Sequence, residues 1–154
     1  MPIGFPNVAF PTRTINSYGQ DQNCYYVTIA ALLGKTVEDL TGETELMQNI
    51  TGTDADIKEV FRAAGVNVQS KEFTNGTDLY NVLMTLPPGS SVGMAYKQHG
   101  RDVGHMLVVQ RDPGSYPLHA APGIRCLDYQ KVPIVESPFP PAPHIERAWI
   151  YFQA

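Results

Sequence analysis

The sequence predicts an α+β fold, with helices in the first half of the chain and antiparallel strands in the second. The first half carries apolar residues at helical spacing, whereas the second carries short apolar runs separated by polar turns. In addition, 13 prolines and 13 glycines in 154 residues require many turns between short elements. This length corresponds to one domain. We therefore expect a single domain over residues 19–154, after an extended arm over residues 1–18 whose prolines exclude a helix.

The most apolar segment of the chain, residues 24–34, predicts a helix at the centre of the fold. Polar residues precede it, Gly34 can end it, and its Ala-Ala-Leu-Leu stretch favours a helix over a strand. A helix that is apolar all round is buried all round. We expect Cys24 in its first turn, with Gln22 or Asn23 as the N-cap.

Two further helices are predicted from amphipathic spacing and capping residues. Between residues 53 and 65, apolar side chains recur at i, i+3, i+4 and i+7, and a glycine closes the segment. The other helix is expected to be capped by Thr77 and Asp78 and to stop at Pro87. Residues 36–40 predict a short helical turn.

Five strands are predicted from short apolar or alternating runs bounded by turn residues. A polar link between the second and the third predicts a β-hairpin. The Pro-rich segment 133–143, before the last strand, is expected to be a surface loop in polyproline conformation. The predicted strands are residues 66–73, 91–96, 103–110, 124–130 and 147–152.

Composition excludes several classes of function. Lys and Arg number 11 against 15 Asp and Glu, a net charge of −4, which argues against binding nucleic acid through its phosphates. No apolar run approaches the ~20 residues of a membrane helix, and no signal peptide is visible, so a free chain is expected to stay in the cytoplasm and outside the membrane. The spacing of four His and two Cys predicts neither a structural zinc site nor a cofactor.

A thiol in the first turn of a central helix, as expected for Cys24, is a candidate nucleophile. The positive end of the helix dipole and the free N–H groups there stabilise the thiolate, which is the reactive form. Alone, the residue fits the usual role of cysteine as a small buried apolar side chain better. The other cysteine, Cys126, lies on a predicted strand. We expect both thiols to be free, because a disulfide needs Cα atoms within about 7 Å.

His105 stands at the head of a predicted strand, directly behind Gly104, which would let a substrate come close. A histidine on such a rigid element suits the role of general base for the thiol.

Asp128 is the expected partner of this histidine. It lies on the following strand, where antiparallel pairing puts facing side chains about 5 Å apart, so it can accept the second ring N–H and fix the tautomer. Asp102 and Asp112 are rival partners, but both fall in predicted loops. Gln130 shares the strand face of Asp128 because the strand period is two.

Cys24 at a helix start, His105 on a strand and Asp128 on the next strand follow the nucleophile, base and orienting-acid logic of thiol hydrolases. In this the chain resembles the papain-fold cysteine hydrolases, and specifically the papain-like toxin domains of bacterial polymorphic toxins. The resemblance spans about residues 20–130. It rests on Asn23-Cys24 before the apolar helix, Gly104-His105 opening a strand, and Asp128-Tyr129-Gln130, which is similar to that family's Asp-Pro-Gln.

The resemblance implies a papain-like fold, in which a central N-terminal helix bearing the cysteine packs on an antiparallel sheet bearing the histidine and the aspartate. It also implies a thiol-dependent amide hydrolase, either a protease or a protein-glutamine deamidase, that acts on a protein in a target cell. A larger toxin would deliver the domain to that cytosol, and a cognate immunity protein is an implied partner. Gln20, or else Gln22, is expected to donate to the oxyanion.

Two alternatives remain open at this point. Peptidoglycan amidases of the NlpC/P60 type share the skeleton but often use a third residue that is His, and neither His119 nor His144 falls on the right strand. The chain could also be an inactive binding module in which Cys24 is a core residue and the segment 133–143 is a docking ligand.

Overall fold

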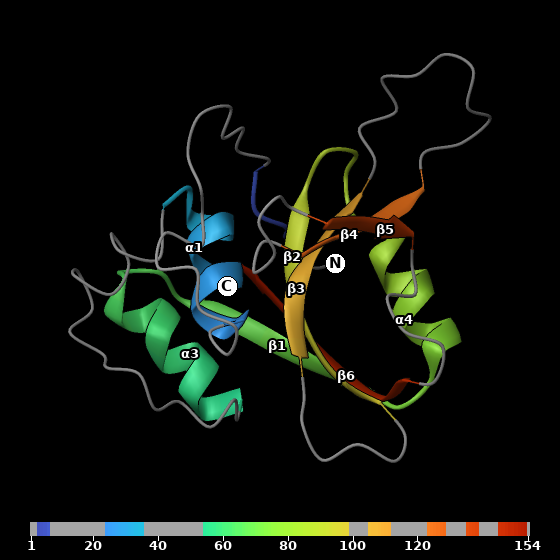
Figure 1. Ribbon diagram of the computed structural model, residues 1–154, viewed down its shortest axis with the longest axis horizontal. Coiled ribbons are helices and arrows are strands. Elements are labelled where there is room, and N and C mark those ends of the chain that lie inside the picture. Colours follow the sequence, from blue (N-terminus) through green and yellow to red (C-terminus); the bar gives the residue numbers. More distant parts are fainter. Residues whose placement is uncertain are drawn as a thin grey trace.

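Six antiparallel strands form one sheet in the order β1-β6-β2-β3-β4-β5, with helices on both of its faces (Figure 1). The computed structural model describes residues 3–6, 24–35, 54–98, 105–111, 123–128, 135–138 and 145–153. The helices are α1 (Cys24–Leu33), α3 (Asp54–Ala63) and α4 (Gly76–Leu83). The strands are β1 (Val68–Phe73), β2 (Ser91–Gln98), β3 (His105–Arg111), β4 (Ile124–Asp128), β5 (Val135–Pro138) and β6 (Ile145–Gln153). The predicted α+β class is confirmed.

Helix α1 is the central helix that the sequence predicts. Its sequence carries no charged residue, and the side chains from Tyr26 to Leu32 are all buried. It ends where Gly34 takes a φ of 75°, a conformation that glycine adopts without strain, and the N–H of Lys35 donates to the carbonyl of Ala30 at 2.8 Å. The helix packs on β2 and β3.

The two amphipathic helices also lie close to their predicted positions. In α3, Ile57, Val60 and Phe61 are fully buried, as the spacing requires. Helix α4 is capped differently from the prediction. Its N-cap is Asn75, whose side-chain oxygen accepts the N–H groups of Thr77 at 2.8 Å and of Asp78 at 3.4 Å. Asparagine is as good a cap as aspartate, and it precedes the first free N–H groups of the helix.

One strand was not predicted. β5 falls inside the segment 133–143, which the sequence analysis assigned to a loop, and it pairs with β4. Its last residue, Pro138, cannot donate a hydrogen bond, and a proline is tolerated at the end of a strand at the edge of a sheet. The predicted hairpin is confirmed as β2 and β3, which pair in the register Tyr96↔His105. The helical turn expected over residues 36–40 lies outside the described residues.

The sheet separates two hydrophobic cores. On one face, covered by α1 and α3, is the α1-side core; on the other, covered by α4, is the α4-side core (Figure 1). The strand members of the α1-side core are Ala95, Met106, Val108, Leu127 and Tyr151. The strand members of the α4-side core are Phe73, Val92, Met94, Tyr96, Leu107, Val109, Cys126, Ala148 and Ile150. Alternate residues of each strand therefore enter opposite cores, as the strand period requires.

The arm predicted over residues 1–18 is extended at residues 3–6, where the structure describes it, but it is also part of the α1-side core. Phe5 is buried, and its ring stacks on that of Phe61 with centroids 5.8 Å apart. The backbone N–H of Phe5 donates to the carbonyl of Ser91 at 2.6 Å, and the reverse bond is 2.8 Å long. This segment therefore belongs to the folded domain.

None of the described helices is long and apolar enough to cross a membrane.

Candidate active site

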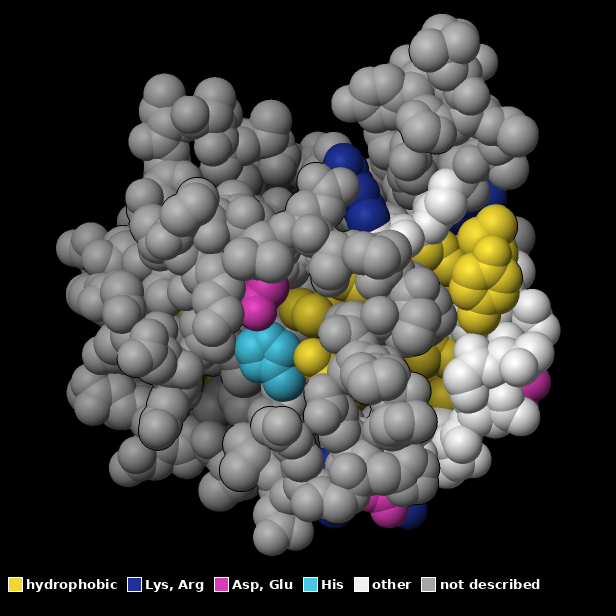
Figure 2. Space-filling view, turned by 45° about the vertical axis from the view of Figure 1, so that its right-hand side comes forward, with side chains coloured by type: hydrophobic (Ala, Val, Ile, Leu, Met, Phe, Trp, Pro, Cys, Tyr) yellow, Lys and Arg dark blue, Asp and Glu magenta, His cyan; other side chains and the backbone are white. Residues whose placement is uncertain are grey.

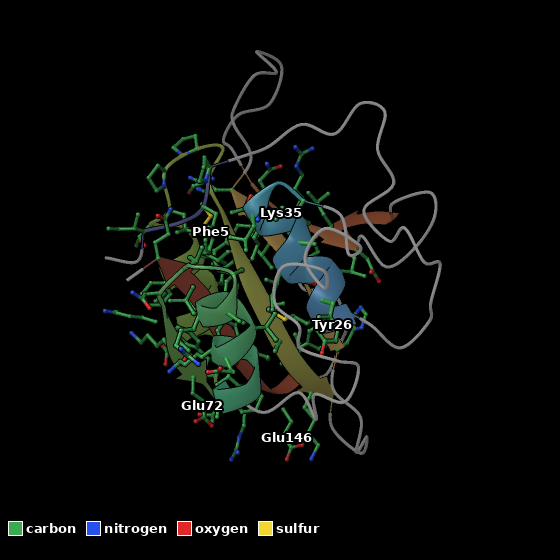
Figure 3. The ribbon with its side chains drawn as sticks, turned by 90° about the vertical axis from the view of Figure 1, so that its left-hand side faces the viewer. Phe5, Tyr26, Lys35, Glu72 and Glu146 are labelled. Carbon is green, nitrogen blue, oxygen red and sulfur yellow. The ribbon has the colours of Figure 1, made fainter. Side chains whose placement is uncertain are left out.

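Cys24 is the first residue of α1, as expected for a thiol that gains from the helix dipole. The N-terminal end of α1 points toward the end of the sheet at which β3 begins. Figure 3 shows Tyr26 at the lower end of the helix and Lys35 at the upper end, and Figure 1 shows β3 starting at the lower end of the sheet. The side chain of Cys24 itself lies outside the described part of the structure.

His105 and Asp128 form the contact that the sequence predicts. Nε2 of His105 and Oδ2 of Asp128 are 3.1 Å apart, a normal hydrogen-bond distance. The strand register explains the contact. Val108 pairs with Leu127, so Asp128 stands diagonally across from His105 on the same face of the sheet. The two side chains are 27% and 17% exposed, and Figure 2 shows the imidazole beside a carboxylate at the surface.

The hydrogen bond defines a tautomer. An ionised carboxylate can only accept, so Nε2 of His105 carries the hydrogen and donates it to Asp128. In the neutral imidazole the other nitrogen, Nδ1, then has the lone pair. Proton exchange with a thiol therefore falls to Nδ1, and this is the arrangement that a general base needs.

The register also places this pair on a particular side of the sheet. His105 has the same parity along β3 as Leu107 and Val109, which belong to the α4-side core, and it stands opposite Tyr96, another member of that core. Helix α1 covers the other face. His105 is the first residue of β3, so the imidazole lies at the end of the strand, across the sheet from the helix that begins at Cys24.

Tyr96 is a neighbour of the site that the sequence analysis missed. Its ring and that of His105 are nearly perpendicular, at 87°, with centroids 5.8 Å apart. The predicted hairpin could have indicated this neighbour, because antiparallel pairing across the polar link puts the last residue of one strand near the first residue of the next.

Cys126 carries a free thiol, as expected. It is completely buried in the α4-side core, and burial raises its pKa to about 12. At neutral pH it is therefore protonated and unreactive, since only the thiolate attacks. The chain thus has one thiol at a helix start and one that is inert by burial.

Several predicted site residues lie outside the described part of the structure. They are the candidate oxyanion and substrate-binding residues Gln20, Gln22, Asn23, Gly104 and Gln130, and the rival acids Asp102 and Asp112. In the described ranges, no three His, Cys, Asp or Glu side chains come together in a group that could hold a metal ion.

Comparisons of the sequence with protein-family models and with curated proteins find no match.

Proposed function

We propose that this chain is a thiol-dependent amide hydrolase in which Cys24 is the nucleophile, His105 the general base and acid, and Asp128 the residue that orients the imidazole. The observation that carries the proposal is the 3.1 Å contact between His105 Nε2 and Asp128 Oδ2, at the end of the sheet toward which the N-terminus of α1 points. The resemblance to papain-like toxin domains supports the same assignment.

In the first half of the reaction, Nδ1 of His105 takes the proton of the Cys24 thiol. The thiolate attacks the carbonyl carbon of an amide, and its charge moves to the carbonyl oxygen in a tetrahedral intermediate. When this intermediate collapses, the C–N bond breaks and the imidazolium gives its proton to the departing nitrogen. An amine or ammonia leaves, and the acyl group stays on Cys24 as a thioester.

Water completes the cycle. Nδ1 of His105 accepts a proton from the water molecule that attacks the thioester carbonyl, and that proton passes to the sulfur when the C–S bond breaks. The products are a carboxylic acid and the free thiol. Throughout both halves, Asp128 holds Nε2–H, so the imidazole keeps the tautomer that presents Nδ1, and its carboxylate stabilises the imidazolium.

We further propose that the substrate is a protein in a target cell, with a cognate immunity protein as a partner, on the strength of the resemblance. Two reactions share the chemistry: cleavage of a backbone amide, which is proteolysis, and cleavage of a glutamine side-chain amide, which is deamidation. Intact-mass spectrometry of target-cell proteins separates them, because deamidation adds about 1 Da to a chain whereas proteolysis divides it.

The test of the proposed function is cytosolic expression of the wild type, Cys24→Ala and Cys126→Ala. We expect Cys24→Ala to abolish growth arrest and target modification, with a loss on the order of 10⁴-fold or more, because no other group replaces the nucleophile. Cys126→Ala is the matched control and should keep both, since its thiol is buried and protonated. Growth arrest by Cys24→Ala equal to that of the wild type would end the thiol-hydrolase proposal.

One observation favours a second candidate, a non-catalytic binding module. The register groups His105 with the α4-side core, across the sheet from α1, so the ion pair with Asp128 could serve structure alone. In that case Cys24 behaves as an ordinary thiol. Its reaction with iodoacetamide at pH 6 discriminates the two candidates, since a catalytic thiolate is alkylated at that pH and an ordinary thiol is not.

A further inference from the structure

A groove lies between the edge strand β1 and helix α4, on the α4 side of the sheet. It is a hollow of about 370 Å³. From β1, Lys71 and Phe73 line it. From α4, its lining includes Asp78, Asn81 and Val82, which stand at i, i+3 and i+4 and so form one stripe of the helix. We call this hollow the β1–α4 groove.

β1 is the last strand of the sheet on the side of this groove. Within the described ranges it pairs with β6 alone, so the main-chain N–H and C=O groups of its other side have no strand partner there. An extended peptide can add to such an edge as a further strand. Main-chain hydrogen bonds then supply affinity, and alternate side chains of the peptide enter the adjoining groove. The edge and the groove together therefore suit an extended segment of another protein.

The lining of the groove determines which side chains such a segment needs. Phe73 is buried and Val82 partly buried, so an apolar side chain of the segment can remove its surface from water against them. Lys71 shares the strand face of Phe73, and its ammonium lies 5.4 Å from the centre of that ring. An acidic side chain directly opposite Lys71 on an added strand would gain a cross-strand partner.

The other charges at the groove already have a role. Oε1 of Glu72 lies 3.1 Å from Nε of Arg147, and Asp78 stands in the first turn of α4, where the helix dipole stabilises a negative charge. In the part of the chain that the structure describes, none of the ion pairs involves Lys71. The ammonium of Lys71 is therefore the charge that a ligand of this groove would meet.

A second copy of the chain is a poor occupant of this edge. Two β1 strands paired antiparallel about Lys71 would bring two ammonium groups together, and pairing about Glu72 would bring two carboxylates together. Like charges directly opposite each other destabilise a strand pair. A segment of different sequence, with an acidic residue at this place, avoids the repulsion.

The groove lies level with the proposed active site. Phe73 is paired with Ala148 on β6. Ala148 is paired in turn with Tyr96, which stands opposite His105. The groove and the imidazole are thus at the two ends of one row across the α4 side of the sheet, three strand spacings or about 14 Å apart. An extended chain covers this distance in about five residues.

We propose that the β1–α4 groove is a docking site for the protein substrate. An extended segment of the substrate adds to β1, with an acidic side chain opposite Lys71 and an apolar side chain, two residues away, on Phe73 and Val82. The docked segment itself is not modified, and it holds the reacting amide near His105. That the bound protein is a substrate rests on the proposed function, whereas the binding depends on the groove alone.

The test uses two blocked peptides, Ac-Thr-Leu-Thr-Glu-Thr-Leu-Thr-NH₂ and the same peptide with Lys in place of Glu. A Leu stands two residues before and after the central residue, so each peptide can pair with β1 in either direction. Binding is followed through the ¹H–¹⁵N shifts of the full chain. We expect the Glu peptide to shift the amides of β1 and of residues 78–82, and to bind about three- to tenfold more tightly than the Lys peptide.

Four variants separate the groove from the rest of the surface. Lys71→Glu should reverse the preference between the two peptides. Lys97→Glu makes the same change of charge on β2, outside the groove, and should keep the wild-type preference. Asn81→Trp fills the groove and should weaken the binding of both peptides, whereas Tyr80→Trp, on the same helix but outside the lining, should not. Thermal unfolding first shows that each variant is folded.

Three results would overturn the docking site. The first is a Glu peptide that leaves the amides of β1 unshifted. The second is a folded Lys71→Glu variant with the wild-type preference. The third is a dimer in sedimentation whose β1 amides shift with protein concentration in the absence of peptide, because the edge would then belong to a second copy.

The outcomes are distinguishable from those for the proposed function, because the peptides bind without being turned over and Cys24→Ala can be titrated in the same way. No peptide binding, while Cys24→Ala is inactive, overturns the docking site and leaves the hydrolase standing. Peptide binding as expected, while Cys24→Ala arrests growth normally, keeps the groove as a protein-binding site and overturns the hydrolase. If both stand, Asn81→Trp should raise KM for the target protein and leave kcat unchanged, and an unchanged KM would overturn the substrate as the occupant.

Discussion

The two faces of the sheet differ in what their helices and strands contribute. On the α1 side, a helix without a single charge packs on the sheet beside α3, and the aromatic rings of Phe5, Phe61 and Tyr151 stack in sequence across the layer. On the α4 side, a short amphipathic helix covers a core whose end carries polar groups, the His105–Asp128 pair. The α1 side supports the start of α1. The α4 side carries the imidazole of His105.

This division bears on the place of the proposed chemistry, which is the end of β3. A residue within the strand is enclosed by one core or the other, as Met106 and Leu107 are. His105, at the first position, is a quarter exposed and can be approached from around the strand end. In the proposed function, the two faces meet at His105.

The largest expected effect on stability lies on the α1 side, at Phe5. We expect Phe5→Ala to lower the free energy of unfolding by about 3–5 kcal/mol, because it removes a buried ring from the stack with Phe61. Chemical denaturation measures this, with Ile3→Ala as the control, since that neighbouring side chain is 60% exposed. A loss below about 1 kcal/mol would show that residues 3–6 lie on the domain without supporting it.

On the α4 side, the largest expected effect is on rate. Asp128→Ala should slow turnover of the target protein by roughly ten- to a hundredfold, less than the 10²–10⁴-fold expected for loss of the base itself in His105→Ala. Asp128→Asn should lose less than Ala, because its amide oxygen still accepts the Nε2–H bond. An Asp128→Ala variant as fast as the wild type would transfer the orienting role to another residue.

The buried thiol of Cys126 predicts a pH effect on stability. Its folded pKa of about 12 is above the ordinary value of 9.0, so the folded state prefers the protonated thiol. The resulting stabilisation is complete below about pH 9 and is lost as pH rises from 9 toward 12, by up to ~1.4 kcal/mol per pH unit. Chemical denaturation at pH 8 and pH 10 should show a smaller decline in the free energy of unfolding for Cys126→Ala than for the wild type. Equal declines in the two proteins would mean that the Cys126 thiol is accessible to water and that its pKa is not raised.

The smallest effect belongs to a surface ion pair outside both cores. Nε of Arg147 and Oε1 of Glu72 are 3.1 Å apart, but both side chains are about half exposed. Glu72→Gln should change the free energy of unfolding by less than about 1 kcal/mol and should leave the reactivity of Cys24 unchanged. A larger change in either measurement would mean that this edge of the sheet is coupled to the site.

The sequence predicts the helices and most strands because their periodicity is unambiguous. In α3 the buried residues fall on one face, and in α1 an apolar run interrupted only by Thr28 ends at Gly34. Strand β5 was missed because the prolines of the segment 133–143 indicate a loop, and its pairing with β4 is a long-range choice that local pattern does not encode. The cap of α4 was assigned two residues late, because Asn75-Gly76 also has the pattern of a turn.

In the candidate site, the pair of His105 and Asp128 was predictable, but the face of the sheet on which the pair lies was not. Asp128 could be chosen over Asp102 and Asp112 from the order of the strands, and its contact with His105 is present. The face of His105 could not be predicted, because residues 106–110 of β3 are all buried and the strand shows no alternation that distinguishes one core from the other. Tyr96 was missed for a related reason, since its place beside His105 depends on register and not on its own neighbours in sequence.

The most direct test of the central claim is the pH dependence of Cys24 alkylation by iodoacetamide, read by peptide mass spectrometry between pH 5 and pH 9 in the wild type and in His105→Ala. Cys126 serves as the internal reference for an inert thiol. The account predicts that wild-type Cys24 reacts at pH 6, whereas in His105→Ala the reaction needs a pH near 9.0, the ordinary pKa of a cysteine thiol. Identical profiles in the two proteins, with Cys24 unlabelled at pH 6, would contradict it.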